Sequence, residues 1–242
     1  MLVQTADGSY TMYSEEFSQH YHSCNEGALN ESLQKHIIPA FSYHKNKKTL
    51  HILDICFGLG YNTLTTLYYI KKHNLNINLY IYSVEFNTDL LHSLENFRYP
   101  NQFNDLKDII KALSKDFYYQ DDNLTIKIYN GDAREYLQNS DIKIDIVYQD
   151  PFSSDTNKNL WTVEYFALIK KLLNNNAIIT TYSIATPIRL AMWENGLLIY
   201  EIQHQKKRST IALNTQKINQ NYKYIDMVLK QQRNKTAKAY KD

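Results

Sequence analysis

The stretch DICFGLGYNT, residues 54–63, decides the fold of this chain. It joins an apolar segment, TLHILDI at 49–55, to a helical pattern at about 61–73. Only six of the 242 residues are glycine, yet two of them fall in this one turn. Glycine allows a sharp backbone turn and a close approach to a ligand, and the first turn of the helix offers unpaired N–H groups. We therefore expect a strand, a tight ligand-binding turn and a helix.

Apolar strand patterns alternate with amphipathic helical patterns over most of the chain. Strands are expected at about 49–55, 80–86, 124–130, 144–150, 177–183, 197–203 and 209–214, and helices at about 61–73, 88–97, 104–116, 132–138, 160–173 and 186–195. Such alternation predicts βαβ units and a mainly parallel sheet with helices on both faces.

The last two expected strands differ from the others, because only HQKKR (204–208) separates them. That segment is too short for a helical crossover, so the pair should be antiparallel. The predicted fold class is therefore α/β and Rossmann-like, with about seven strands, mainly parallel, and a C-terminal antiparallel hairpin. This is the class I fold common among S-adenosylmethionine-dependent methyltransferases.

The chain divides into three expected parts. Residues 1–45 form an N-terminal extension of strand and helix that covers substrate and cofactor, residues 46–215 form the core, and residues 216–242 form a basic polar tail. From residue 201 onward there are ten Lys or Arg residues and three Asp or Glu residues. Residues 1–200 carry seventeen Lys or Arg residues and twenty-two Asp or Glu residues. This asymmetry indicates either a polyanionic partner or a solvated basic face. The last residues, 232–242, are polar enough that we expect them to fray.

Several classes of protein do not fit the sequence. It has no run of about 18 apolar residues and no signal-peptide pattern, so we expect a soluble, cytoplasmic protein without membrane contact. Cys24 and Cys56 lie far apart and should be free, buried thiols. The histidines and cysteines do not have the spacing of metal ligands, so we expect no metal site.

Three consecutive strand ends carry residues suited to a nucleoside. After the GLG turn of the first strand, Glu85 ends the second, where a carboxylate can accept both ribose hydroxyls. Asp132 follows the third strand, where it suits either a helix N-cap or a position beside an adenine amino group. Ligands of such sheets bind at the carboxyl ends of strands. The expected cofactor-binding residues here are Asp54, Gly58, Gly60, Glu85 and Asp132.

The spacing of the turn favours S-adenosylmethionine over a dinucleotide. The dinucleotide pattern GxGxxG fails because Thr63 stands where its third glycine would be, and no second dinucleotide-binding half is evident. The amino-acid part of S-adenosylmethionine would lie near Gly58 and Gly60.

The fourth strand ends in YQDPFS, residues 148–153. It looks like the (D/N)PP(F/Y) motif of methyltransferases that act on amino groups. Nitrogen methylation needs an amine held in line with the methyl group and an acceptor for its protons. Asp150 is the expected catalytic residue and Phe152 part of the wall. The alternative is an ordinary turn, since Asp-Pro commonly opens one.

Short motifs spread over residues 5–213 resemble the MnmC-like methyltransferases. They are YTMYSEEF (10–17), HYHS (20–23), GALNES (27–32), DICFGLGYNTL (54–64), QDPFS (149–153), NLWT (159–162) and TYS (181–183). This family methylates the aminomethyl group of the wobble uridine in certain tRNAs with S-adenosylmethionine. The resemblance implies a tRNA 5-(aminomethyl)-2-thiouridine methyltransferase in its stand-alone form, without the oxidase domain of the bifunctional members. Such an enzyme would act after another enzyme has made the aminomethyl group, and we expect it to be a monomer.

The resemblance also implies site residues. Gly58, Gly60 and Glu85 would bind the cofactor, Asp132 would lie near the adenine, and Asp150 would lie at the catalytic centre. Glu31 and Ser32, at the start of the N-terminal helix, would also reach the cofactor.

A base of the tRNA anticodon loop can be splayed out and stacked on aromatic rings. Tyr13, Phe152 and Tyr182 are the expected rings; the alternative for any single one is an ordinary core or surface aromatic. The expected phosphate-binding residues are Lys206, Lys207 and Arg208.

Two other functions remain open from the sequence. A small-molecule amine methyl- or aminopropyltransferase of the spermidine synthase type would use the same sheet and similarly placed acids. A non-catalytic tRNA-binding module would keep the scaffold without activity.

Overall fold

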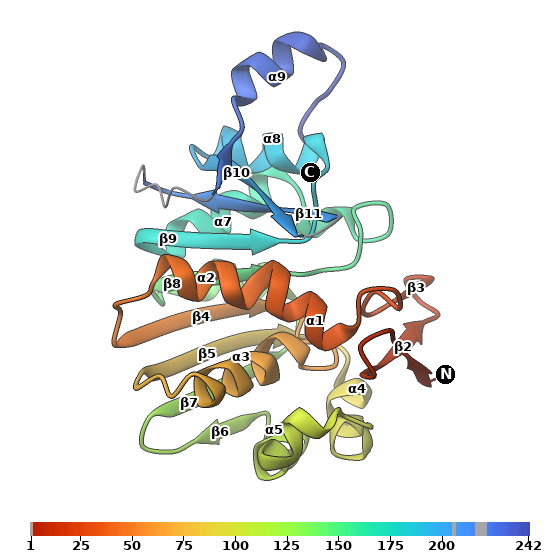
Figure 1. The fold of residues 1–242 in the computed structure, drawn as a ribbon. Coiled ribbons are helices and arrows are strands. Elements are labelled where there is room, and N and C mark those ends of the chain that lie inside the picture. The colour runs from red at the N-terminus through yellow and green to blue at the C-terminus, as the bar shows by residue number, and fades with distance from the viewer. Residues whose placement is uncertain (1, 205–206, 216–221) are drawn as a thin grey trace.

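The computed structural model describes residues 2–204, 207–215 and 222–242, and its core is a nine-stranded sheet (Figure 1). The strand order is β12-β10-β11-β9-β8-β4-β5-β7-β6. In chain order the strands are β4 (Thr49–Ile55), β5 (Asn78–Glu85), β6 (Tyr118–Gln120), β7 (Leu124–Asn130), β8 (Ile144–Gln149), β9 (Leu173–Thr181), β10 (Leu198–His204), β11 (Lys207–Leu213) and β12 (Lys223–Tyr224).

The expected fold class is confirmed. Strands β7, β5, β4, β8 and β9 are parallel, and β11 runs antiparallel to both β9 and β10. These seven strands form the predicted core with its closing hairpin, while β6 and β12 are short additions at the two edges. Strand β8 is buried along its whole length because helices cover both faces of the sheet.

Side chains alternate between the two faces along each strand. In β4, Leu50 and Ile52 pack on one face, and Leu53 and Ile55 pack on the other. The first face is covered by α1 (Ala28–Ser32), α2 (Ile38–Tyr43), α3 (Tyr61–Lys72), α4 (Thr88–Ser93) and α5 (Lys107–Asp116). The second face is covered by α6 (Ala133–Asn139), α7 (Val163–Leu172), α8 (Thr186–Glu194) and α9 (Met227–Arg233). Short 3₁₀ turns lie at Leu94–Asn96, Asn101–Leu106 and Lys158–Leu160.

The N-terminal segment forms a small sheet of its own beside one end of the core (Figure 1). Its antiparallel strands are β1 (Leu2–Gln4), β2 (Tyr10–Ser14) and β3 (Gln19–His20). A continuous helical stretch follows, in which a π-helical turn, Leu33–Ile37, separates α1 from α2. This stretch continues past Pro39 and ends at Tyr43. Pro39 is tolerated because it is the second residue of α2, in the first turn after the π-helical turn.

The C-terminal segment corrects one expectation. Residues 232–242 were expected to fray, but Ala237, Ala239 and Tyr240 pack against the second face of the core. The backbone N–H of Val163 donates to Tyr240 O at 2.9 Å, and Arg134 pairs with Asp242. A few small or aromatic side chains and two ion pairs, Arg134–Asp242 and Lys241–Glu194, dock this otherwise polar segment. Within the described ranges, every helix is too short or too polar to cross a bilayer.

Candidate active site

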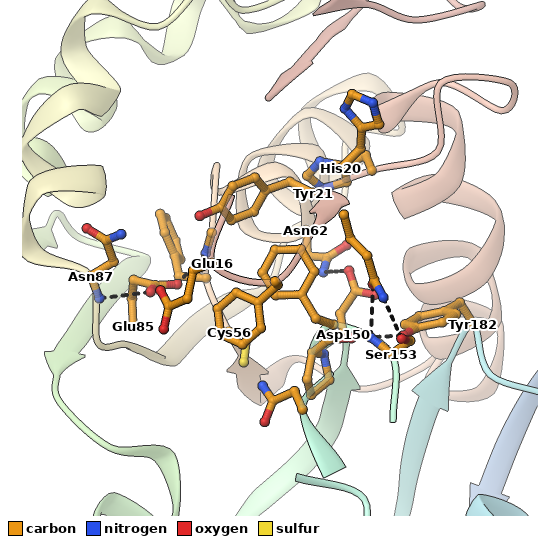
Figure 2. Close-up of a pocket in the computed structure, with 18 of the residues that line it drawn as sticks. Glu16, His20, Tyr21, Cys56, Asn62, Glu85, Asn87, Asp150, Ser153 and Tyr182 are labelled. Carbon is orange, nitrogen blue, oxygen red and sulfur yellow. Dashed lines mark hydrogen bonds between the residues drawn. The ribbon is translucent and has the colours of Figure 1, made fainter. Parts of the chain in front are cut away.

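A pocket opens at the carboxyl ends of β4, β5 and β8, beneath the N-terminal segment (Figure 2). The empty space between its walls is about 980 Å³, which includes open solvent. Four stretches form most of its wall: residues 16–23, the turn after β4, the end of β5 and the loop after β8. The parallel strands bring these distant stretches together, as in other doubly wound sheets.

The wall of the pocket is acidic. Glu16, Glu31, Glu85 and Asp150 line it, and none of its described lining residues is lysine or arginine. The negative charge of Glu31 is partly neutralised by Lys35, which does not line the pocket and whose Nζ donates a hydrogen bond to Glu31 Oε1 at 2.6 Å. An acidic wall favours a ligand with positive charge, such as a sulfonium or an ammonium group.

The glycine turn and Glu85 form one hydrogen-bonded unit. The Glu85 carboxylate accepts from Gly58 N at 2.9 Å and from Asn87 N at 3.0 Å. Burial raises the pKa of Glu85, and these backbone hydrogen bonds oppose that rise. Gly60 has φ of +75°, and a Cβ there would lie 2.9 Å from the Phe57 ring. The turn therefore requires glycine, and it holds the Gly58 backbone and the carboxylate at the pocket wall.

Asp150 is held by two side chains from different helices. Asn62 Nδ2, on α3, donates to its Oδ2 at 2.8 Å, as Figure 2 shows. His36 Nε2 lies 3.5 Å from its Oδ1. Burial alone would raise the pKa of Asp150, but His36, His22 and Asn62 outweigh burial and lower it. Asp150 is therefore a carboxylate at neutral pH and faces the pocket as a hydrogen-bond acceptor.

A second carboxyl group, that of Asp54, lies fully buried at the end of β4. Burial raises its pKa to about 8, although a 2.7 Å hydrogen bond from Thr63 Oγ1 acts in the opposite direction. Its Oδ1 has no hydrogen-bond partner among the described residues, which fits a carboxyl group that keeps its proton at neutral pH.

Asp54 should make the free energy of unfolding depend on pH. Because its pKa is higher in the folded protein, its stabilising effect is complete below the unfolded-state pKa near 4 and is lost as pH rises toward about 8. Asp54→Asn should remove this decline, which has a maximum slope of about 1.4 kcal/mol per pH unit. Urea unfolding of both proteins across this range measures the difference. Equal slopes in the two proteins would contradict the assignment.

The N-terminal segment closes over the loop that follows β8. The Phe17 ring stacks on Phe152 with centroids 4.5 Å apart, and Tyr21 lies 5.1 Å from the same ring. Gln19 Nε2 donates to Ser153 Oγ at 2.6 Å (Figure 2). From the opposite side, Tyr182 OH donates to Pro151 O and Trp161 Nε1 donates to Phe152 O, both at 2.9 Å. The pocket thus has an aromatic cover above its acidic wall.

The structure brings together only part of the predicted site. The predicted residues that line the pocket are Glu31, Gly58, Glu85, Asp150, Phe152 and Tyr182. Asp54, Gly60 and Ser32 lie outside its lining. Asp132 also lies outside it and caps α6, accepting from Arg134 N at 2.9 Å. Tyr13 is 40% exposed and packs edge-on against His20, which does line the pocket.

The predicted phosphate-binding residues lie at the hairpin. Lys207 forms an ion pair with Glu26, and Arg208 forms one with Glu201 at 3.4 Å. Lys206 lies outside the described residues. Since Thr210 pairs with Thr181 at the end of β9, Lys207 extends beyond the carboxyl edge of the sheet, on the same side as the pocket.

Sequence reasoning missed four residues around Asp150 and its loop. Asn62 lies in the glycine-containing stretch, two positions after Gly60, but no sequence pattern indicated that its amide would donate a hydrogen bond to Asp150. Gln19, His22 and His36 reach the site from the N-terminal segment through contacts that no local pattern predicts.

Comparisons with known proteins identify related folds. A family model described as S-adenosyl-L-methionine-dependent methyltransferase matches residues 100–216. A crystal structure of MnmC2 from Aquifex aeolicus superposes with a TM-score of 0.80 at 28% identity, covering 88% of this chain and 70% of that one. These matches confirm the class I methyltransferase fold and S-adenosylmethionine as the cofactor. The backbone of Gly58 and the Glu85 carboxylate are the groups suited to hold it.

Two relatives are similar over most of this chain. An uncharacterized protein of Methanocaldococcus jannaschii is 29% identical over 224 residues, 88% of this chain and 58% of that protein. The tRNA 5-methylaminomethyl-2-thiouridine biosynthesis bifunctional protein MnmC of Campylobacter fetus is 24% identical over 232 residues, 87% of this chain and 35% of that protein. The chain thus spans between about a third and three fifths of these relatives. Among the residues that the structure describes, no three His, Cys, Asp or Glu side chains are placed to hold a metal ion.

Proposed function

Because this chain is an S-adenosylmethionine-dependent methyltransferase related to MnmC, we propose that its acceptor is the exocyclic amine of 5-aminomethyl-2-thiouridine at the wobble position of tRNA. The product is the 5-methylaminomethyl nucleoside. On this proposal, another enzyme supplies the aminomethyl group before methylation.

The observation that carries the proposal is the Asp150 carboxyl group, which accepts a hydrogen bond from Asn62 at the wall of an acidic, aromatic-covered pocket. S-adenosylmethionine, when bound, supplies an electrophilic methyl group. The attacking amine must be neutral, so an ammonium acceptor first gives one proton to Asp150 or to water. Asp150 offers the lone pairs that orient the amine N–H groups, and the Phe152 ring bounds the space beside it. The surrounding carboxylates favour entry of a positively charged amine.

The tRNA part of the proposal is supported by charge and by the relatives. Lys207 lies near the pocket, because its partner Glu26 also binds Lys35, which in turn binds the pocket residue Glu31. A cation at this rim can contact a phosphate of the anticodon loop. The name of the Campylobacter fetus relative describes biosynthesis of the proposed product in tRNA.

The test is methyl transfer from labelled S-adenosylmethionine to tRNA that carries 5-aminomethyl-2-thiouridine, followed by nucleoside mass spectrometry. We expect the label in 5-methylaminomethyl-2-thiouridine. The same tRNA without the aminomethyl group is the matched acceptor control. A polyamine panel run in parallel tests the rival function, and label in polyamines with none in tRNA would replace the proposal with a small-molecule amine transferase. Failure of the protein to bind S-adenosylmethionine by calorimetry would instead favour a non-catalytic module.

A further inference from the structure

His36 is a completely buried histidine in the π-helical turn between α1 and α2. π turns are rare and occur frequently at functional sites. The proposed function gives this side chain no role, yet it is one of the two groups that hold Asp150.

Thr180 lies on one side of the His36 imidazole. His36 Nδ1 lies 2.8 Å from Thr180 Oγ1, and the same hydroxyl lies 3.3 Å from Val147 O. The single hydroxyl hydrogen of Thr180 can go to either acceptor, so this side of the ring is compatible with both tautomers of His36.

The other ring nitrogen then faces Asp150. His36 Nε2 lies 3.5 Å from Asp150 Oδ1 and has no hydrogen-bond partner among the described residues. Two buried lone-pair atoms facing each other are unfavourable unless a proton lies between them. In unliganded sites such contacts are often long and shorten in the reacting complex. The His36 imidazole packs edge-on against the Tyr148 ring, with the two ring centroids 5.6 Å apart, and this contact restricts the plane of the imidazole.

We propose that His36 is a positioning residue for Asp150: its Nε2–H group faces Oδ1 and so keeps the Asp150 carboxylate ionised and aimed at the acceptor amine. Asn62 completes the arrangement by donating to Oδ2, so that both carboxylate oxygens are held. The proposal rests on the proposed function in one respect, because the amine is the group that the carboxylate orients.

Other titratable groups surround the pair from several elements. They are His22 after β3, Glu31 on α1, Asp54 and Cys56 at the end of β4, Glu85 at the end of β5 and Tyr182 after β9. Burial lowers the pKa of His22 and raises that of Asp54 to about 8. The remaining nearby charges are mostly carboxylates, which oppose ionisation of Asp150. His36 is therefore the main buried group that favours its ionised form.

Replacement of His36 should move the acid limb of the pH profile of kcat to higher pH. His36→Phe removes the ring N–H donor, and His36→Gln keeps an amide donor. We expect the limb to rise by about one to three pH units in the phenylalanine variant and by less in the glutamine variant. The KM for S-adenosylmethionine should change by less than about threefold. His73→Gln, on an exposed residue at the end of α3, is the matched control and should keep the wild-type profile.

A second measurement needs no acceptor. Carbon-13 NMR of the aspartate carboxyl groups follows the titration of Asp150 directly, with Asp150→Asn identifying its signal. We expect the pKa of Asp150 to rise in both His36 variants, more in phenylalanine than in glutamine. An unchanged Asp150 titration in a folded variant would overturn the proposal. If wild-type protein does not methylate the tRNA, the proposed function fails while the NMR titration still decides the role of His36. Should the phenylalanine variant fail to fold, the closer-sized glutamine variant supplies the comparison.

Discussion

Asp150→Asn is expected to reduce kcat for methyl transfer by about 10²- to 10⁴-fold, the usual range for losing a positioned proton acceptor. A carboxylate offers two acceptor oxygens to the amine, whereas the asparagine amide offers one acceptor oxygen and an NH₂ donor. The variant therefore accepts fewer hydrogen bonds from the amine. Asn62 and His36 remain, so the site should keep its shape. Calorimetry should find the dissociation constant of S-adenosylmethionine within about threefold of wild type, because the loss arises in the chemical step.

The matched control for this variant is Asp155→Asn. Asp155 is exposed, lies in the same loop and does not line the pocket. Its replacement removes one negative charge nearby and should leave single-turnover rates unchanged. If Asp150→Asn turned over as fast as this control, Asp150 would have no catalytic part.

Glu85→Gln is expected to weaken S-adenosylmethionine binding by about 10- to 100-fold. Hydrogen bonds to a charged group contribute about 1.5–3 kcal/mol, and a loss of 1.4 kcal/mol is a tenfold change in affinity. The Glu85 carboxylate already accepts from Gly58 N and Asn87 N. The glutamine amide replaces one acceptor with a donor, which would face one of these N–H groups. The variant therefore loses both a ribose acceptor and the support of the turn.

Calorimetric titration of S-adenosylmethionine measures this loss directly. Asp89→Asn is the control, since Asp89 is an exposed acid in the first turn of the next helix. Thermal unfolding should establish that the Glu85→Gln protein is folded. An affinity equal to that of the control would mean that Glu85 only supports the turn.

The parts of the fold and site that follow local rules could be predicted from the sequence. Strand β4, the glycine turn and α3 are adjacent along the chain, and Glu85 and Asp150 end strands whose apolar patterns are clear. Since parallel strands end at one edge of a sheet, their carboxyl ends had to converge. The parallel direction of the core strands follows from the same alternation, and the antiparallel final pair follows from its short connection.

The remaining parts depend on contacts between segments that are distant in sequence. Gln19 and Ser153 are 134 residues apart, and His36 reaches Thr180 across 144. No periodicity links such positions. The docking of the last residues was also unpredictable, because it depends on the surface that α7 happens to present to Tyr240.

The π turn within the first helix also sets the rotational phase of everything on either side of it. An α-helix advances by about 100° per residue, whereas a π turn is wider and shifts that count. Glu31 faces the pocket before the turn, and Phe41 packs against Tyr69 after it. An insertion or deletion of one residue between 33 and 37 would rotate one side relative to the other. The length of this stretch is therefore as tightly constrained as the identity of its residues.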